Sequence, residues 1–131
     1  MNNIKQILVA TAVFLLMDAI WLGFVAKDLY IQHMGKFLRL ENGSIVPNYF
    51  AAALVYIALI GGILIFVIPK ADGNAMHALY YGAIFGLVCY ATYDFTNLAV
   101  MANWPVWISI MDVIWGGVIC AVSSYLAVLA S

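Results

Sequence analysis

Residues 75–101, AMHALYYGAIFGLVCYATYDFTNLAVM, decide the fold because they form one long apolar run that also contains an aspartate. An apolar run of about 20 residues is long enough to cross the ~30 Å hydrocarbon core of a bilayer as a helix. Small residues recur on one face of this helix, at Ala78, Gly82 and Gly86, and such a stripe allows a neighbouring helix to approach closely. Asp94 lies on the same face, so we expect its carboxyl group to face protein and not lipid.

The composition of the whole chain is that of an integral membrane protein. Of the 131 residues, 67% are hydrophobic and 8% are charged, and the mean hydropathy is +1.07. A soluble domain carries roughly a quarter charged residues, so five Lys+Arg and six Asp+Glu cannot cover a water-exposed surface. A net charge of −1 also offers no basic patch for nucleic acid. The composition therefore excludes a soluble protein and a nucleic-acid partner, and it predicts a lipid bilayer as the surroundings.

Apolar runs and turn signals divide the chain into four predicted spans within a single transmembrane domain, residues 1–131. The spans and the polar connection after the first of them are expected at approximately 4–24, 49–68, 75–101, 105–129 and, for the connection, 25–47. Backbone groups in lipid must pair within helices, and four spans place both termini on the same side. We therefore predict an all-α, antiparallel four-helix bundle without strands.

Proline and asparagine residues mark the expected helix ends. Pro69 is expected to end the second span because its ring has no amide hydrogen, and Asn74 is expected to cap the third. The sequence Asn-Trp-Pro at 103–105 predicts a cap followed by a first-turn proline. Trp104 and Trp107 then begin the fourth span, where tryptophan is typical of an interfacial anchor. In the polar connection, the pair Asn42-Gly43 signals a turn, and interleaved apolar and charged residues predict a short surface helix.

Three aspartates lie inside the predicted spans, namely Asp18, Asp94 and Asp112. A charged side chain at a helix centre costs ~2.5–3.5 kcal/mol on insertion scales, so each of them needs a reason. At a rise of 1.5 Å per residue, all three fall roughly 10 Å below the membrane face that carries the polar connection. We therefore predict that the three carboxyl groups converge on one interior cavity open toward that connection.

A short internal repeat surrounds two of these acids. Residues 17–23 (MDAIWLG) and 111–117 (MDVIWGG) are identical at five of seven positions. In each copy a tryptophan, Trp21 or Trp115, follows the aspartate by three residues and shares its helix face. Because the two helices are antiparallel, we expect the two indole rings to bracket the layer of carboxylates. The repeat is also consistent with a weak inverted pseudo-symmetry of the kind found around transporter sites.

The candidate ligand-binding residues combine these acids and tryptophans with two further residues on the stripe of the third span. They are Asp18, Trp21, Tyr90, Asp94, Asn97, Asp112 and Trp115. No Lys or Arg lies inside a predicted span, so the acids require protons, a metal cation, or a cationic or hydroxyl-rich ligand. Oxygen ligands suit Mg²⁺ or Ca²⁺, and Asp18, Asp94 and Asp112 are the candidates for such a site. The alternative is that protonated aspartates only hold the helices together through hydrogen bonds.

These motifs together resemble the domain-of-unknown-function family 2177 of small bacterial predicted membrane proteins. The resemblance rests on Asp18-x-x-Trp21-Leu22-Gly23, Pro47-Asn48, the block YATYDFTNLA at 90–99, Trp104-Pro105 and Asp112-x-x-Trp115-Gly116. It extends over essentially the whole chain, and the Tyr-Asp-x-Thr-Asn block is its most specific part. It implies a four-span protein, multi-pass in the bacterial cytoplasmic (inner) membrane, and implies no particular activity.

Three functions remain open at the level of sequence. The first, which we favour slightly, is transport of a cationic substrate in exchange for protons, and this would require a homodimer because four helices enclose little interior. The second is an intramembrane enzyme that acts on a lipid or isoprenoid-like substrate with a divalent metal. The third is a small-molecule sensor or accessory subunit with a pocket lined by Trp and Tyr.

Overall fold

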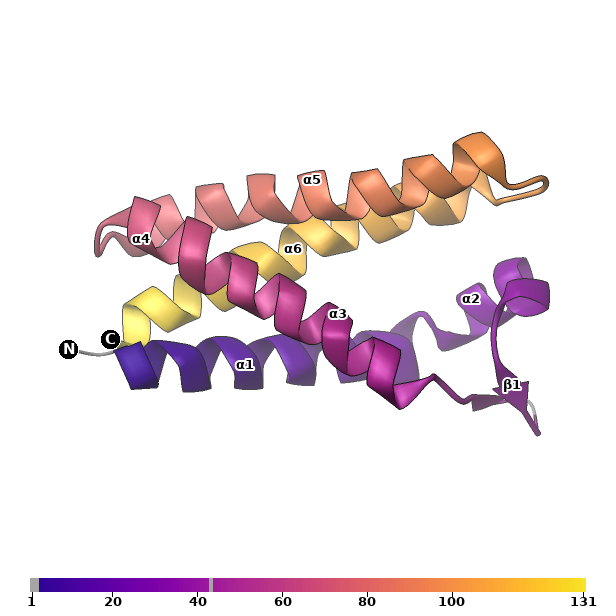
Figure 1. Cartoon of the computed structure of the whole chain (residues 1–131), viewed down its shortest axis with the longest axis horizontal. Helices are drawn as coiled ribbons and strands as arrows, with labels where there is room; N and C mark the ends of the chain where they lie inside the picture. The colour runs from indigo at the N-terminus through magenta and orange to yellow at the C-terminus, as the bar shows by residue number, and fades with distance from the viewer. Residues whose placement is uncertain (1–2, 43) are drawn as a thin grey trace.

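The computed structural model describes residues 3–42 and 44–131, and this part of the chain is almost entirely helical. Within it, four helices are long and apolar enough to cross a membrane. These spans cover Ile4–Val25, Tyr49–Ala71, Ala75–Val100 and Val106–Ala130. The first consists of α1 (Asn3–Ile20) and a terminal π-helical turn η1 (Trp21–Val25), and the last two are α5 (Ala75–Val100) and α6 (Val106–Ala130). The two ends of the chain lie together at one end of the bundle (Figure 1). The prediction of an all-α membrane bundle is confirmed.

The polar connection contains the expected short helix, α2 (Lys27–Met34), followed by a single 3-10 turn η2 (Gly35–Phe37). It also contains a two-residue antiparallel ladder between β1 (Leu40–Glu41) and β2 (Ser44–Ile45), so the prediction of a structure without strands is wrong. The ladder lies outside the spans, where a tight turn can pair its two arms. Asn42 has the left-handed φ of 54° that such a turn requires. Gly43, the second residue of the predicted turn, lies outside the described residues.

The second span does not end at Pro69. It runs through α3 (Tyr49–Gly62), a π-helical segment η3 (Ile63–Val67) and α4 (Ile68–Ala71), with Pro69 in the first turn of α4. A proline clashes with the carbonyl of the preceding turn and lacks a donor, and the wider π turn just before it accommodates both defects. The helix therefore continues until Asp72, which takes the left-handed conformation with a φ of 53°.

Of the two predicted asparagine caps, one is confirmed and the other is wrong. Asn74 caps α5, because its side chain accepts a hydrogen bond of 3.1 Å from the backbone N–H of His77. Asn103 does not cap α6. It has a left-handed φ of 64°, and Pro105 directly precedes the first residue of the helix with no side-chain cap. The chain reverses at Asn103 before it enters α6, so the asparagine is used in the turn instead.

Helices α5 and α6 pack against each other more extensively than any other pair of elements in the described structure. The buried face of α5 is the predicted stripe, Ala78, Gly82, Gly86 and Asp94. A Cβ atom on Gly86 would lie 2.0 Å from the carbonyl oxygen of Gly116, and one on Gly82 would lie 2.6 Å from that of Cys120. The two backbones are therefore in direct contact, at a distance that only glycine permits.

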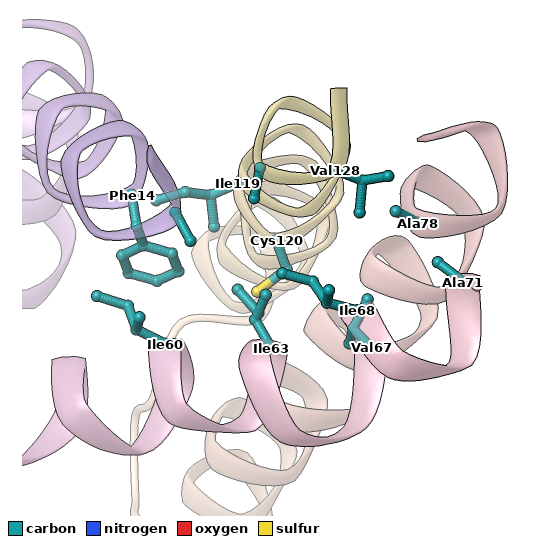
Figure 2. Close-up of a cluster of buried hydrophobic side chains, with 12 residues drawn as sticks. Phe14, Ile60, Ile63, Val67, Ile68, Ala71, Ala78, Ile119, Cys120 and Val128 are labelled. Carbon is teal, nitrogen blue, oxygen red and sulfur yellow. The ribbon is translucent and has the colours of Figure 1, made fainter. Parts of the chain in front are cut away.

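An apolar core fills the half of the bundle that lies toward the termini. Figure 2 shows Phe14 of α1 opposite Ile60 of α3, with Ile63, Ile119 and Cys120 filling the space between the helices. These side chains come from three different spans, so the core fastens α1, α3 and α6 to one another.

A second, smaller core lies at the opposite end, where α2 covers the start of α6. It includes Tyr30 and Met34 of α2 together with Trp104, which is only 6% exposed and stacks obliquely with Phe37 at 5.1 Å between ring centroids. The prediction of Trp104 as an interfacial anchor is therefore wrong, because the polar connection folds over it. Trp107 is exposed on the lipid-facing side, as expected for an anchor.

The span formed by α3 crosses the bundle obliquely (Figure 1). Its C-terminal part, η3 and α4, packs against α5, whereas its N-terminal part approaches α1. Helices α3 and α5 consequently diverge toward the polar connection.

Substitution of Gly86 tests the backbone contact between α5 and α6. We expect Gly86→Ala to lower the free energy of unfolding by about 1–3 kcal/mol, because the added methyl group overlaps the Gly116 carbonyl. The measurement is unfolding in mixed micelles followed by circular dichroism. The matched control is Gly61→Ala on α3, where an added Cβ would meet no atom within 4 Å. Equal stability of the two variants would contradict the close approach of the two helices.

Candidate functional site

A cavity of about 480 Å³ lies at the end of the bundle that carries the polar connection. This volume is in the range of about 300–1,000 Å³ that is typical of small-molecule sites. Its walls come from the end of the first span, from α2 and the rest of the connection, and from α3, α5 and α6. The lining is apolar apart from three tyrosines and two aspartates, Tyr30, Tyr56, Tyr93, Asp94 and Asp112. Among the described residues, no Lys, Arg or His lines it.

Asp94 is the most deeply buried of these polar side chains. It is 2% exposed, and its Oδ2 atom has no hydrogen-bond partner within the described part of the chain. Its carboxyl group lies near that of Asp112, close enough for the two to interact. Buried polar atoms in proteins are almost always hydrogen-bonded, so an exception calls for an explanation. Asp94 therefore presents to the cavity an acceptor that lacks a donor.

Asp112 is held by a short chain of hydrogen bonds from the connection. The hydroxyl group of Tyr30 donates to Oδ1 of Asp112 at 2.8 Å, and Nε1 of Trp21 donates to the same hydroxyl at 3.1 Å. Burial raises the pKa of the Tyr30 phenol above its usual range, and the adjacent Asp112 carboxylate raises it further. Tyr30 therefore stays a neutral donor and ties α2 to α6 across the cavity.

Asp18 is buried but does not line the cavity, which corrects the expectation that all three acids meet there. Its Oδ2 atom accepts a hydrogen bond of 2.5 Å from the hydroxyl group of Tyr56, and Tyr56 is the residue that reaches the cavity wall. The ring of Tyr56 also contacts Phe14 edge-on, at 6.0 Å between centroids. The acid is paired with α3, which approaches α1 here, so the side chain of Tyr56 and not that of Asp18 lies on the cavity wall.

Trp21 and Trp115 stack on each other and do not bracket the acids, so this prediction is wrong. Their ring centroids are 4.4 Å apart and the rings are within 6° of parallel. Helical side chains lean toward the N-terminus of their own helix. In two antiparallel helices, Trp21 therefore leans away from the connection and Trp115 leans toward it, and the rings meet. Nε1 of Trp115 is buried without a hydrogen-bond partner in the described structure, beside the carboxyl group of Asp18.

The two remaining candidate residues, Tyr90 and Asn97, do not line the cavity that holds Asp94. Tyr90 packs over Gly116, where a Cβ atom would lie 2.2 Å from the tyrosine ring, and it lines a second cavity between α3 and α5. Asn97 is half-buried one turn from Asp94 and beside Tyr93, and it lines neither cavity itself.

The acids do not form a three-ligand metal centre. Over residues 3–42 and 44–131, no group of three His, Cys, Asp or Glu side chains is placed to hold a metal ion. The expected Mg²⁺ or Ca²⁺ arrangement needs Asp18 beside Asp94 and Asp112, and Asp18 is instead directed at Tyr56. Two carboxyl groups and phenols remain, and these suit an organic donor better than a divalent cation that prefers six or more oxygen ligands.

Two residues of the site, Tyr30 and Tyr56, were missed by the sequence analysis. Tyr56 is the only side chain with a polar atom between residues 50 and 69, and a lone hydroxyl group in an apolar span must find a partner. Tyr30 shares a helical spacing of four residues with Ala26 and Met34, which marks the buried face of α2. Both signals are present in the sequence.

The fold is that of a small multi-pass membrane protein, and two aspartates line a cavity inside its bundle. The sequence model of the family of predicted membrane proteins designated DUF2177 matches residues 3–129, and the chain belongs to that family, as its motifs indicate. No curated protein and no solved structure matches the chain. The chemistry of the cavity therefore carries the functional argument.

Removal of the Tyr30 hydroxyl group tests the chain of hydrogen bonds to Asp112. We expect Tyr30→Phe to lower the free energy of unfolding by about 0.6–1.7 kcal/mol, the range measured for interhelical hydrogen bonds in membranes. The unfolded chain releases the Tyr30 proton near pH 10 and the folded chain does so only at higher pH, so this residue stabilises the fold less as the pH rises above about 10. The stability difference between parent and variant should therefore be constant below about pH 10 and shrink above it.

Unfolding by detergent titration at a series of pH values provides the measurement. Tyr49→Phe, at an exposed position at the start of α3, is the matched control and should leave the free energy of unfolding unchanged at neutral pH. A Tyr30→Phe protein as stable as the parent at neutral pH would show that the hydroxyl group does not tie α2 to α6.

Proposed function

We propose that this protein binds, within the bacterial cytoplasmic membrane, a small molecule that presents a cationic or hydrogen-bond-donating group to Asp94 and Asp112. The observation that carries this proposal is Oδ2 of Asp94, an unpartnered oxygen of a side chain that is 2% exposed, on the wall of a cavity of about 480 Å³. An ammonium or hydroxyl group is the chemical complement of that oxygen.

The charge of the cavity narrows the ligand class further. Two acids and no basic side chain line it among the described residues, so a phosphate or carboxylate ligand would meet only like charge. A cation would gain the attraction of both carboxyl groups, and the tyrosine rings in the lining can face it favourably. The same two acids would otherwise need to share a proton, because like charges close together in a low dielectric cannot both remain ionised.

If Asp94 and Asp112 share a proton when no ligand is bound, binding of a cation releases that proton. This coupling favours transport over an intramembrane enzyme or a small-molecule sensor. A cation that binds between Asp94 and Asp112 displaces the shared proton, which is the elementary step of proton-coupled exchange. The apolar core around Phe14, Ile63 and Cys120 fills the bundle toward the termini (Figure 2), so of the two membrane faces the site is nearer the one that carries the polar connection. We propose that transport alternates this access by movement of α3 in a homodimer, because one four-helix unit encloses little interior.

The binding test uses three water-soluble probes, namely ethanolamine, Mg²⁺ and inorganic phosphate. We expect ethanolamine alone to raise the melting temperature of the purified protein in detergent, saturably, and less strongly as the pH falls, because protons compete for the same oxygens. Asp94→Asn should remain folded, melt at the same or a higher temperature, and lose the ethanolamine effect, because it removes an unpartnered buried acid.

The matched control is Asp72→Asn, the same chemical change in the loop before α5, and it should keep the ethanolamine effect. Stabilisation by Mg²⁺ and not by ethanolamine would replace the proposed ligand by a metal. A parent protein that responds to no probe, together with a destabilised Asp94→Ala, would show that the acid serves only to hold helices together.

A further inference from the structure

A second cavity, of about 460 Å³, adjoins the first and lies between α3 and α5. Its walls are formed by Val55, Ala58 and Leu59 of α3 and by Cys89 and Tyr90 of α5. Tyr93 and Asp112 line both cavities, so the two spaces lie next to each other at these residues. The cavity that holds Asp94 thus has a neighbour on the side of α3 and α5 that shares Asp112 with it.

The second cavity faces the bilayer. Val55 and Tyr93 on opposite sides of it are 54% and 56% exposed, and α3 diverges from α5 in this region (Figure 1). Asp112 lies seven residues into its span from Pro105, about 10 Å below the membrane face, which is within the hydrocarbon layer. We call this space, defined by the residues named above, the lateral opening.

The route from water passes the polar connection, whereas the route from lipid does not. On the side of the polar connection, Met34, Leu38 and Pro47 line the first cavity, and Tyr30 ties α2 to Asp112 by a hydrogen bond of 2.8 Å. The lateral opening is formed by α3 and α5 where they diverge, and its lining contains no residue of the connection among those described. A molecule dissolved in the bilayer therefore reaches Asp112 without displacing α2.

We propose that the ligand of this site comes from the bilayer and is an amphiphile with an amine or alcohol head group and one hydrocarbon chain. The head group lies between Asp94 and Asp112, and the chain lies in the lateral opening. This inference rests on the proposed function and specifies its ligand. The absence of basic side chains from the described lining of both cavities excludes amphiphiles with a phosphate head group.

The test is photolabelling in vesicles of phosphatidylcholine. The probes are hexadecylamine, hexadecanol and hexadecyl phosphate, each with a diazirine in the middle of the chain. We expect the amine and the alcohol, and not the phosphate, to label residues 55–59 and 89–93, as mapped by mass spectrometry of peptides. Asp94→Asn should reduce this labelling by the amine about tenfold or more, the equivalent of one lost charge-assisted hydrogen bond.

Two substitutions on α3 separate the lateral opening from ordinary lipid contact. Ala58→Trp fills the opening and should abolish labelling at both segments, whereas Ala53→Trp, at an exposed position that lines neither cavity, should leave it unchanged. Ala58→Leu is a smaller plug to be used if the tryptophan variant does not fold, as judged by its melting temperature.

The outcomes distinguish this inference from the function on which it rests. The inference would be overturned if labelling were the same for all three head groups and were unchanged both in Asp94→Asn and in a folded Ala58 variant. Such labelling would reflect ordinary contact with boundary lipid. If ethanolamine still stabilises the parent and not Asp94→Asn in that case, the binding function stands and its ligand comes from water. If ethanolamine also has no effect, both proposals fail together.

Discussion

The direct backbone contact between α5 and α6 is the constraint on which the rest of the structure depends. Gly86 and Gly116 meet with no room for a side-chain carbon, and this fixes the register of the two helices. Asp94 follows Gly86 by two turns and Asp112 precedes Gly116 by one, so both acids lie on the connection side of the contact. Because each side chain leans toward the N-terminus of its helix, Asp94 leans away from the connection and Asp112 leans toward it. The remaining difference in height is thereby reduced, and the two carboxyl groups face one cavity.

Burial in lipid requires a partner for every polar atom, and the three intramembrane acids meet this requirement unequally. Asp18 accepts from Tyr56, and Asp112 accepts from Tyr30, so a phenol from a different element satisfies each of them. Asp94 has a free oxygen although it is the most buried of the three. If the acids served only to join helices, the most buried one would be expected to be the best satisfied. The acid with the unpartnered oxygen, Asp94, is one of the two that line the cavity.

Sequence analysis predicted the features that depend on one helix at a time. Approximate span positions, the small stripe of α5 and the cap at Asn74 follow from residue order and helical periodicity. The predictions failed for side chains whose positions depend on two or more helices. The stacking of Trp21 on Trp115 and the turn of Asp18 toward Tyr56 depend on the rotation and crossing of neighbouring helices, which depth alone does not give. The continuation of the helix past Pro69 depends on a π turn that the run of apolar residues before it does not signal.

A single side-chain hydrogen bond ties α3 to another helix in the described structure. Between residues 50 and 69, Tyr56 is the only side chain with a polar atom, and its hydrogen bond to Asp18 ties α3 to α1 beside the cavity. On the side of the termini, the apolar core holds this span in place. On the side of the polar connection, α3 diverges from α5 (Figure 1). Apolar contacts with lipid and with protein differ little in energy, so the hydrogen bond of Tyr56 is the contact that most distinguishes one position of this part of α3 from another. A ligand of the proposed site would contact Tyr56 in the cavity, and it would act on the hydrogen bond that ties α3 to α1. Binding would then be coupled to the width of the lateral opening.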